Sequence, residues 1–117
     1  MKISRVAELL GAQIVCCPEK ADSDVHSACG SDMMSDVLAF VKDQAVLLTG
    51  LCNPQVIRTA EMMDMRCVVF VRSKQPSEAM LELARESGIV VLTSKLRMYE
   101  ACGVLYESGL NSLKVEA

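Results

Sequence analysis

Polar and cationic residues gather in three segments of this 117-residue sequence, each joining a predicted strand to a predicted helix. The segments are residues 49–53, 72–77 and 93–95. The unpaired N–H groups and the positive end of a helix favour an anion at such a junction. A phosphate or a carboxylate therefore fits the residues that gather there, which are Thr49, Gly50, Asn53, Arg72, Ser73, Lys74, Ser77, Thr93, Ser94 and Lys95.

Each of these residues alone also has an ordinary structural explanation. Asn53, Ser77 and Ser94 are typical helix N-caps, and Gly50 is a typical turn residue. Only the convergence of the three segments favours a ligand site. In an open α/β sheet, ligands bind beyond the carboxyl ends of the strands, which is where these segments are predicted to lie.

Motifs for enzymatic chemistry are absent from the sequence. It contains no G-x-x-x-x-G-K-[ST] loop, no G-x-G-x-x-G fingerprint and no G-x-S-x-G nucleophile elbow. A thiol nucleophile would need the single histidine, His26, beside Cys29 or Cys52 in space. Asp32 and Asp36 lie four apart, but a cap and a first-turn charge explain them better than acid–base catalysis. We therefore expect no catalytic residues, with a thiol-dependent enzyme as the remaining alternative.

The cysteines form neither a disulfide pattern nor a metal-binding pattern. No two of them have C-x-x-C spacing, and the gaps match no zinc or iron–sulfur motif. His26 and Cys29 are spaced as half of a metal site, but no second half follows. We predict free thiols, largely buried, with no metal and no cofactor. The six positions are Cys16, Cys17, Cys29, Cys52, Cys67 and Cys102.

Charge and hydropathy exclude two classes of partner. Twelve basic and 15 acidic residues give a net charge of −3, without the basic stripe that nucleic-acid binding needs. The longest apolar run, 67–71, is far shorter than the ~20 residues that span a bilayer. The first ten residues lack the apolar region and cleavage site of a secretory signal. We therefore expect a cytoplasmic protein that binds neither nucleic acid nor membrane.

Strands and helices are predicted to alternate along the chain. Strands that are apolar throughout indicate a parallel sheet covered on both faces, so the fold class is α/β, a three-layer α/β/α arrangement with a mostly parallel sheet. Residues 1–117 are predicted to form one domain, with a core over 3–109 and a frayed tail over 110–117. The predicted strands are 13–17, 25–28, 45–49, 66–71 and 89–92, and the helices are 5–10, 35–41, 54–63, 78–87 and 95–108.

The helix ends carry recognisable signals. Ser4, Asn53 and Ser77 are the predicted N-caps of their helices, and a hydroxyl of the Thr93–Ser94 turn is predicted to cap the last helix. Gly11 and Gly88 are predicted to end helices in the left-handed conformation. The short helix near residue 35 is predicted to be capped by Ser35 or Asp32 and to turn three side chains inward: Val37, Leu38 and Val41.

Eight methionines are many for a chain of this length. Thioethers fill gaps in a core, and they also serve adaptable contacts with partners. The core is the favoured location. Exposure of Met33 and Met34 beside Phe40 would instead indicate an oligomer interface.

Four segments together resemble the DRTGG domain over residues 3–109. They are residues 6–12, the S-D-x-x-S-D-V-L segment at 31–38, the Asn53-Pro54 helix start and the final helix with Tyr99, Glu100 and Tyr106. The segment at 31–38 is the most specific of the four. The five-letter string that names the family does not occur in the sequence.

The resemblance implies a regulatory module. DRTGG domains resemble the N-terminal domain of HPr kinase/phosphorylase, and they occur as regulatory parts of phosphotransacetylases and of nucleotide-regulated pyrophosphatases. Kinase activity is not implied, because the phosphoryl-transfer machinery of HPr kinase lies in a separate domain with a P-loop.

We therefore expect a non-catalytic module that binds a small anionic, nucleotide-like ligand, a partner enzyme or signalling protein, or both. A homodimer is expected. The alternative is a pure interaction or dimerisation module without a small ligand. The predicted ligand-binding residues are Ser31, Asp32, Ser35, Asp36, Thr49, Gly50, Asn53, Arg72, Ser73, Thr93 and Ser94.

Overall fold

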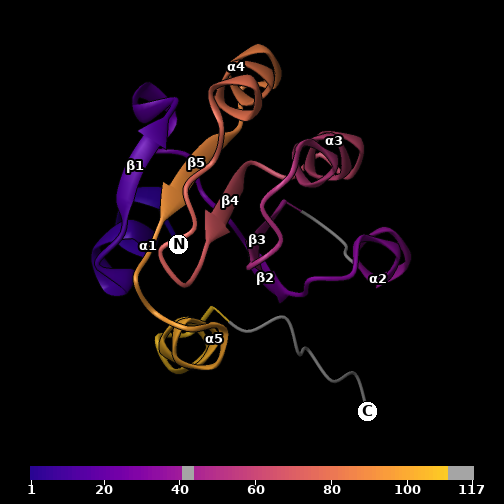
Figure 1. Ribbon diagram of the computed structural model, residues 1–117. Coiled ribbons are helices and arrows are strands. Elements are labelled where there is room, and N and C mark those ends of the chain that lie inside the picture. The colour runs from indigo at the N-terminus through magenta and orange to yellow at the C-terminus, as the bar shows by residue number, and fades with distance from the viewer. Residues whose placement is uncertain (41–43, 111–117) are drawn as a thin grey trace.

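A single sheet organises the part of the chain that the computed structural model describes, residues 1–40 and 44–110. The strand order is β1-β5-β4-β3-β2 (Figure 1). The strands β2, β3, β4 and β5 are parallel, whereas β1 runs antiparallel to β5 at one edge. Their bounds are β1 Gln13–Cys16, β2 Ser27–Gly30, β3 Ala45–Thr49, β4 Cys67–Phe70 and β5 Val90–Thr93.

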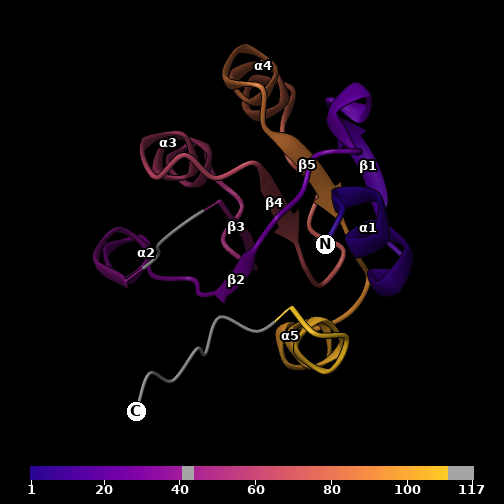
Figure 2. The same ribbon diagram turned by 180° about the vertical axis from the view of Figure 1, so that it is seen from behind.

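Helices cover both faces of the sheet. Figures 1 and 2 show α2, α3 and α4 along one face and α1 and α5 along the other, where α1 packs against α5. A short 3-10 turn, η1 (Pro18–Lys20), follows β1. The predicted three-layer α/β/α fold with a mostly parallel sheet is confirmed. The helices are α1 Ile3–Leu10, α2 Met34–Phe40, α3 Pro54–Met62, α4 Glu78–Ser87 and α5 Met98–Glu107.

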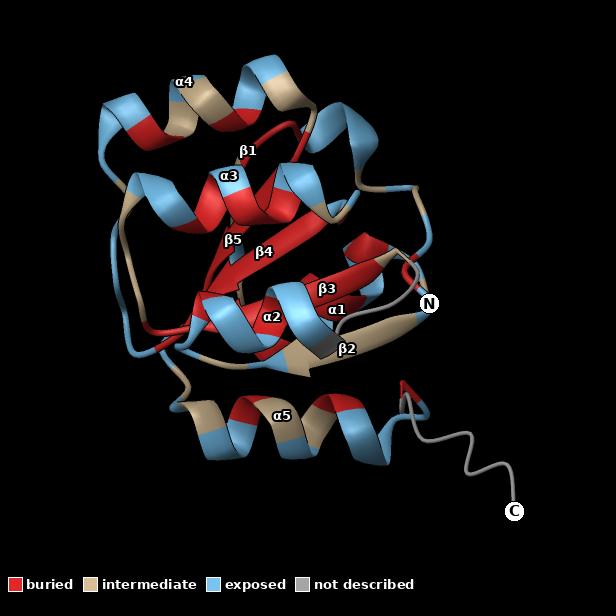
Figure 3. Ribbon diagram, turned by 90° about the vertical axis from the view of Figure 1, so that its right-hand side faces the viewer, coloured by how far each residue is buried: buried red, intermediate tan, exposed pale blue. Residues whose placement is uncertain are grey.

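The central strands form the core. All residues of β3, β4 and β5 are buried (Figure 3). Strands buried on both faces are apolar throughout instead of alternating, which accounts for much of the 51% hydrophobic content. Phe70 is the bulkiest fully buried side chain, and the rest of the core is aliphatic or sulfur-containing. None of the described helices is long and apolar enough to cross a membrane.

Several helix ends follow the local sequence signals. Gly11 and Gly88 end α1 and α4 in the left-handed conformation, with φ of 56° and 69°. The side chain of Asn53 accepts a hydrogen bond from the Val56 N–H, and that of Ser77 accepts one from the Met80 N–H. These four predictions are confirmed.

The predicted cap at Ser4 is wrong. Helix α1 begins at Ile3, two residues before the start that a cap at Ser4 implies, and no side chain caps it. The N–H groups of Ile3 and Ser4 instead donate to the carbonyls of Ser23 and Ala21, each at 2.9 Å. Because a distant segment satisfies these N–H groups, the hydroxyl of Ser4 has no capping role.

Helices α2 and α5 also differ from expectation. The cap of α5 is Arg97, without a side-chain hydrogen bond, and the helix starts at Met98 instead of residue 95, so the predicted hydroxyl cap from Thr93–Ser94 is wrong. In α2, Val37 is buried as predicted, but Leu38 is 41% exposed. Met33 is exposed and Met34 is buried, while Val41 and the side chain of Phe40 lie outside the described residues.

Strand β2 and the C-terminal segment also differ from their predicted boundaries. Strand β2 begins at Ser27, two residues later than predicted, and extends to Gly30. Leu110, which was predicted to belong to a frayed tail, is buried, and its N–H donates to the Leu105 carbonyl. Residues 111–117 of that predicted tail lie outside the described residues.

Substitutions at Ser77 and Ser4 test which of the two helices, α4 or α1, depends on a side-chain cap. Ser77→Ala is expected to lower the free energy of unfolding by about 1 kcal/mol, because it removes the acceptor for the Met80 N–H. Ser4→Ala is expected to leave the free energy of unfolding nearly unchanged, because the backbone of the 21–23 segment accepts those hydrogen bonds. Urea titration of the two variants measures the difference. Equal losses at both serines would contradict it.

Candidate ligand site at the carboxyl edge of the sheet

The loops that follow β2, β3, β4 and β5 meet at one edge of the sheet. Parallel strands place all their carboxyl ends at the same edge, and the register brings Thr49 beside Phe70 and Phe70 beside Thr93. The backbone continues this pairing into the loops: the Ser31 N–H donates to Leu48 and the Ser94 N–H donates to Phe70. Segments distant in sequence therefore form one surface.

Asp32 ties two of these loops together. Its Oδ1 accepts hydrogen bonds from the Thr49 hydroxyl at 3.0 Å and from the Gly50 N–H at 2.7 Å. The Thr49 hydroxyl in turn accepts a hydrogen bond from the Leu51 N–H at 3.1 Å. The exposed carboxylate thus fixes the start of the β3–α3 loop, and the predicted capping role of Asp32 is wrong.

Arg72 lies over this loop. A Cβ built on Gly50 would come within 2.5 Å of Arg72 Nη2, so the guanidinium occupies the space beside the glycine. Arg72 and Ser73 both have positive φ, 57° and 58°, and their N–H groups donate to the carbonyls of Leu96 and Ser94. Within the described residues Arg72 forms no ion pair, so its exposed charge is available to an anion.

The start of α3 adds unpaired donors at the same place. Among the described residues, the N–H groups of Cys52 and Asn53 donate to no protein acceptor. Lys74 lies close enough to Cys52 for its charge to lower the thiol pKa, although burial has the larger effect and the net pKa is raised. Backbone donors, an arginine and a lysine therefore share one edge, an arrangement that suits an anion.

Buried hydroxyls at this edge serve the fold. The Ser94 hydroxyl donates to the Leu10 carbonyl at 2.9 Å and accepts from the Leu96 N–H at 3.2 Å, so it joins the end of α1 to the β5–α5 loop. Thr93, Thr49 and Ser94 are all buried. The sequence gives no local signal for the contact between Ser94 and Leu10, which lie 84 positions apart in the chain.

The remaining predicted residues either form other hydrogen bonds or lie away from Asp32 and Arg72. Asn53 belongs to the edge but is occupied as the N-cap of α3. Ser31 exchanges hydrogen bonds with the backbone of Met33 in its own loop. Ser35 and Asp36 are exposed on α2, and no described contact joins them to Asp32 or Arg72. The cluster that the structure brings together is Asp32, Thr49, Gly50 and Arg72.

The cysteines and the histidine are not arranged as an activated pair. Burial raises the pKa of Cys29 and, more strongly, that of Cys67. His26 lies before β2 at the opposite edge of the sheet from Cys52, in a hollow with Gln44 and Asp64. In the described part of the chain, no group of three or more His, Cys, Asp or Glu side chains is placed to hold a metal ion.

The raised pKa values lead to a kinetic expectation. At pH 8 the native Cys29 and Cys52 thiols should react with iodoacetamide more slowly than free cysteine, because fewer of them are thiolates. Quenched peptide mass mapping measures each rate, and urea-unfolded protein is the control in which the thiols should react alike. If native Cys29 or Cys52 reacts faster than free cysteine, that thiol is activated, and the result would support the alternative of a thiol-dependent enzyme.

Comparisons with known proteins give one family and one fold. The sequence model of the DRTGG domain matches residues 5–108. A search of curated proteins finds no significant match. The structure is similar, with a TM-score of 0.72 and 14% identity, to a crystal structure of the CBS and DRTGG domains of the regulatory region of Clostridium perfringens pyrophosphatase, complexed with its activator, diadenosine tetraphosphate. The similarity covers 92% of this chain and 46% of that one.

Proposed function

Since the chain belongs to the DRTGG domain family, we propose that it is a non-catalytic regulatory module that binds a small anionic, nucleotide-like ligand at the carboxyl edge of its sheet. The observation that carries this proposal is the exposed Arg72 guanidinium, which lies beside Gly50 without an ion-pair partner among the described residues. Arginine presents a planar set of donors that matches phosphate oxygens.

The surrounding groups suit the two parts of a nucleotide. Arg72, Lys74 and the N–H groups of Cys52 and Asn53 supply positive potential for a phosphate. Asp32 supplies the opposite charge a short distance away: one of its oxygens holds Thr49 and Gly50, and the other is an acceptor for a hydroxyl of a ribose. A free inorganic phosphate would contact only the cationic side chains and the N–H groups, and it would not use Asp32.

The structural neighbour supports the ligand class. That regulatory region was crystallised with diadenosine tetraphosphate as its activator, a ligand that joins nucleosides through a polyanionic chain. At 14% identity the similarity to this neighbour shows the fold alone. That this chain also binds a nucleotide-like ligand is our proposal. The chain spans less than half of the neighbour's length, and we propose that the described fold is one regulatory domain that transmits its signal to a partner enzyme.

The site favours binding over catalysis. Asp32 already accepts hydrogen bonds from two groups, which holds its carboxylate in place as a structural anchor. Burial raises the pKa of the Cys52 thiol, which belongs to the β3–α3 loop, and this opposes its activation as a nucleophile.

Gly50→Ala is the substitution that tests the site most cleanly. The new methyl group would displace the guanidinium, the far end of a flexible side chain, while the backbone of Gly50 needs no positive φ. We expect the melting temperature without ligand to change little and the affinity for diadenosine tetraphosphate to fall about tenfold or more, in line with the loss of one charge-assisted hydrogen bond. Isothermal calorimetry measures the affinity.

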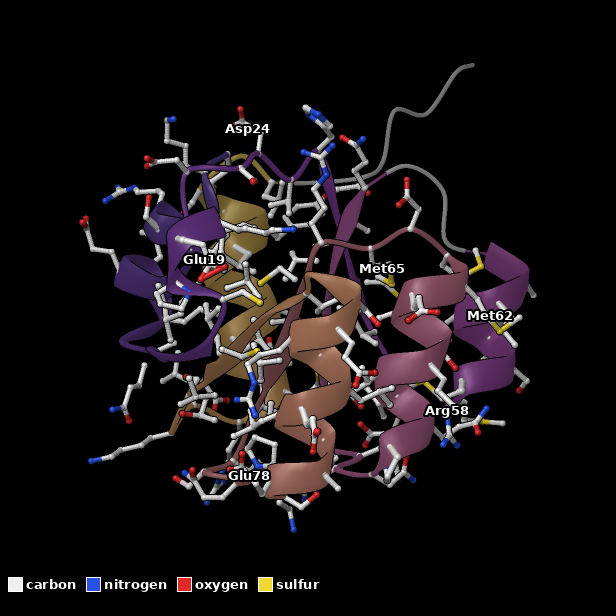
Figure 4. The ribbon with its side chains drawn as sticks, turned by 90° about the horizontal axis from the view of Figure 1, so that it is seen from above. Glu19, Asp24, Arg58, Met62, Met65 and Glu78 are labelled. Carbon is white, nitrogen blue, oxygen red and sulfur yellow. The ribbon has the colours of Figure 1, made fainter. Side chains whose placement is uncertain are left out.

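The matched control is Arg58→Gln, which removes an exposed arginine of α3 (Figure 4). Its affinity should equal that of the unsubstituted protein. Wild-type protein that binds none of diadenosine tetraphosphate, ATP and inorganic phosphate would contradict the proposal. Saturating ligand at 100 times its Kd should add about 2.7 kcal/mol to the free energy of unfolding.

A second candidate function is a pure interaction or dimerisation module. Large apolar side chains are exposed just before α2 and at the end of α3: Met33 is 60% exposed and Met62 is 74% exposed, and Figure 4 shows Met62. Tyr99 and Tyr106 are exposed on α5. Sedimentation at two protein concentrations separates the candidates, because a homodimer without any ligand response favours the second.

A further inference from the structure

Two consecutive cysteines lie side by side at the end of β1. The Sγ atoms of Cys16 and Cys17 are 3.6 Å apart, and both residues are buried. Neighbouring side chains of a regular strand point to opposite faces of the sheet. The two sulfur atoms can therefore lie this close only if the backbone leaves the regular strand conformation. The nucleotide proposal does not involve either residue.

The backbone turns sharply at the second cysteine. Cys17 adopts the left-handed conformation, with φ of 54° and ψ of 48°, and Pro18 then begins η1. The pairing of β1 with β5 is also irregular between Ile14 and Cys16. A left-handed non-glycine residue costs about 1 kcal/mol or more, so the surrounding structure must hold the two sulfurs in place.

The pair lines a surface hollow between β1, η1 and α4. Its other lining residues are Val15, Pro18, Glu19 and Arg85, and Figure 4 shows Glu19 in the η1 turn. Arg85 forms an ion pair with Glu78, with 3.0 Å between Nη2 and Oε1. Burial, with the hydrogen bond to Cys17, raises the pKa of Cys16 to about 12, although the Arg85 charge acts in the opposite direction. Cys16 is therefore a neutral thiol in the absence of a ligand.

The spacing of the sulfurs suits chelation better than a disulfide. Two thiolates that each lie about 2.3 Å from one tetrahedral ion are about 3.8 Å apart, close to the observed 3.6 Å. A disulfide between neighbours would join Cα atoms about 3.8 Å apart, below the usual range of about 4.4–6.8 Å.

We propose that Cys16 and Cys17 form a bidentate two-sulfur site for a soft, thiophilic ion, such as a soft divalent cation or trivalent arsenic. A divalent cation displaces one proton from each thiol and forms two metal–sulfur bonds, which leaves a neutral pair suited to burial. An organic arsenoxide forms two arsenic–sulfur bonds, and its oxygen leaves as water with the two thiol protons. Since no third protein ligand is placed among the described residues, the remaining coordination positions face the hollow.

Native mass spectrometry with phenylarsine oxide tests the site. Folded protein should retain one phenylarsenic group per chain, and Cys17→Ser should lose most of that retention. Cys52→Ser, at the other edge of the sheet, is the matched control and should retain it fully. Equal retention by Cys17→Ser and wild-type protein would overturn the proposal, as would the absence of binding to the folded wild type.

A second measurement covers the case in which Cys17→Ser does not fold. Cd²⁺ binding to wild-type protein in weak buffer at pH 7 should release two protons per ion and produce a sulfur-to-cadmium absorption band. Cys16→Ala should remove that band while Cys52→Ser keeps it. Cd²⁺ that binds without this band, or with the same band in Cys16→Ala, would show that other groups hold the ion.

Discussion

Replacing Gly30 with alanine is expected to lower the free energy of unfolding by about 1–3 kcal/mol. Gly30 ends β2, and a Cβ there would lie 2.5 Å from Cys102 Sγ and 3.4 Å from Met98 Sδ. Both sulfurs belong to α5, so the added methyl group must push this helix away from the sheet or force the short Cys102 side chain into another rotamer. Urea unfolding measures the loss.

Gly103→Ala is the matched control within α5. A Cβ at Gly103 meets nothing within 4 Å, and alanine favours a helix over glycine by about 1 kcal/mol, so this variant should be more stable than wild type. Adding Cys102→Ala to Gly30→Ala should recover part of the lost stability, because it removes the atom that clashes. If Gly30→Ala is as stable as Gly103→Ala, the described contact between β2 and α5 is wrong.

Replacing Asp32 with alanine is expected to cost about 1–3 kcal/mol of unfolding free energy and to weaken ligand binding. The substitution removes the acceptor for the Gly50 N–H and for the hydroxyl of the fully buried Thr49. A buried donor left without a partner carries a penalty of this size. The loop beside Arg72 should loosen at the same time, so chemical denaturation and calorimetry should both register the change.

Asp36→Ala controls for the loss of a carboxylate in the same segment. Asp36 is exposed in the first turn of α2, where its favourable interaction with the helix end is worth less than about 1 kcal/mol. Ligand affinity should stay unchanged in this variant. Equal effects of Asp32→Ala and Asp36→Ala on binding would show that Asp32 does not organise the site.

Features that depend on neighbours in the sequence could be predicted from it. The left-handed glycines at 11 and 88 and the caps at Asn53 and Ser77 each involve residues within one helical turn. The buried strands follow from unbroken apolar runs, and the parallel sheet follows from their alternation with helices. These signals are local, so the sequence was sufficient for the fold class.

Features that depend on distant partners could not be predicted. Ser4, Asp32 and Ser94 all have the chemistry of caps, but each is used differently. Ser4 N–H donates to Ala21, Asp32 holds Gly50, and the Ser94 hydroxyl donates to Leu10 across 84 positions of the chain. The alternation of strands and helices predicts that the strand-end loops share one edge of the sheet. The approach of Arg72 to Gly50 could not be predicted, because it depends on the positive φ at Arg72, which no local residue preference indicates.

Amide chemical-shift mapping with diadenosine tetraphosphate tests the proposed ligand site most directly. Titration of ¹⁵N-labelled protein should move the amide signals of residues 50–53 and 72–74 most, and Arg72→Gln should suppress those movements at the same ligand concentration. No movement of any amide signal at millimolar ligand would contradict the account. So would movements centred on the opposite edge of the sheet, around His26 and Asp64, that persist in Arg72→Gln.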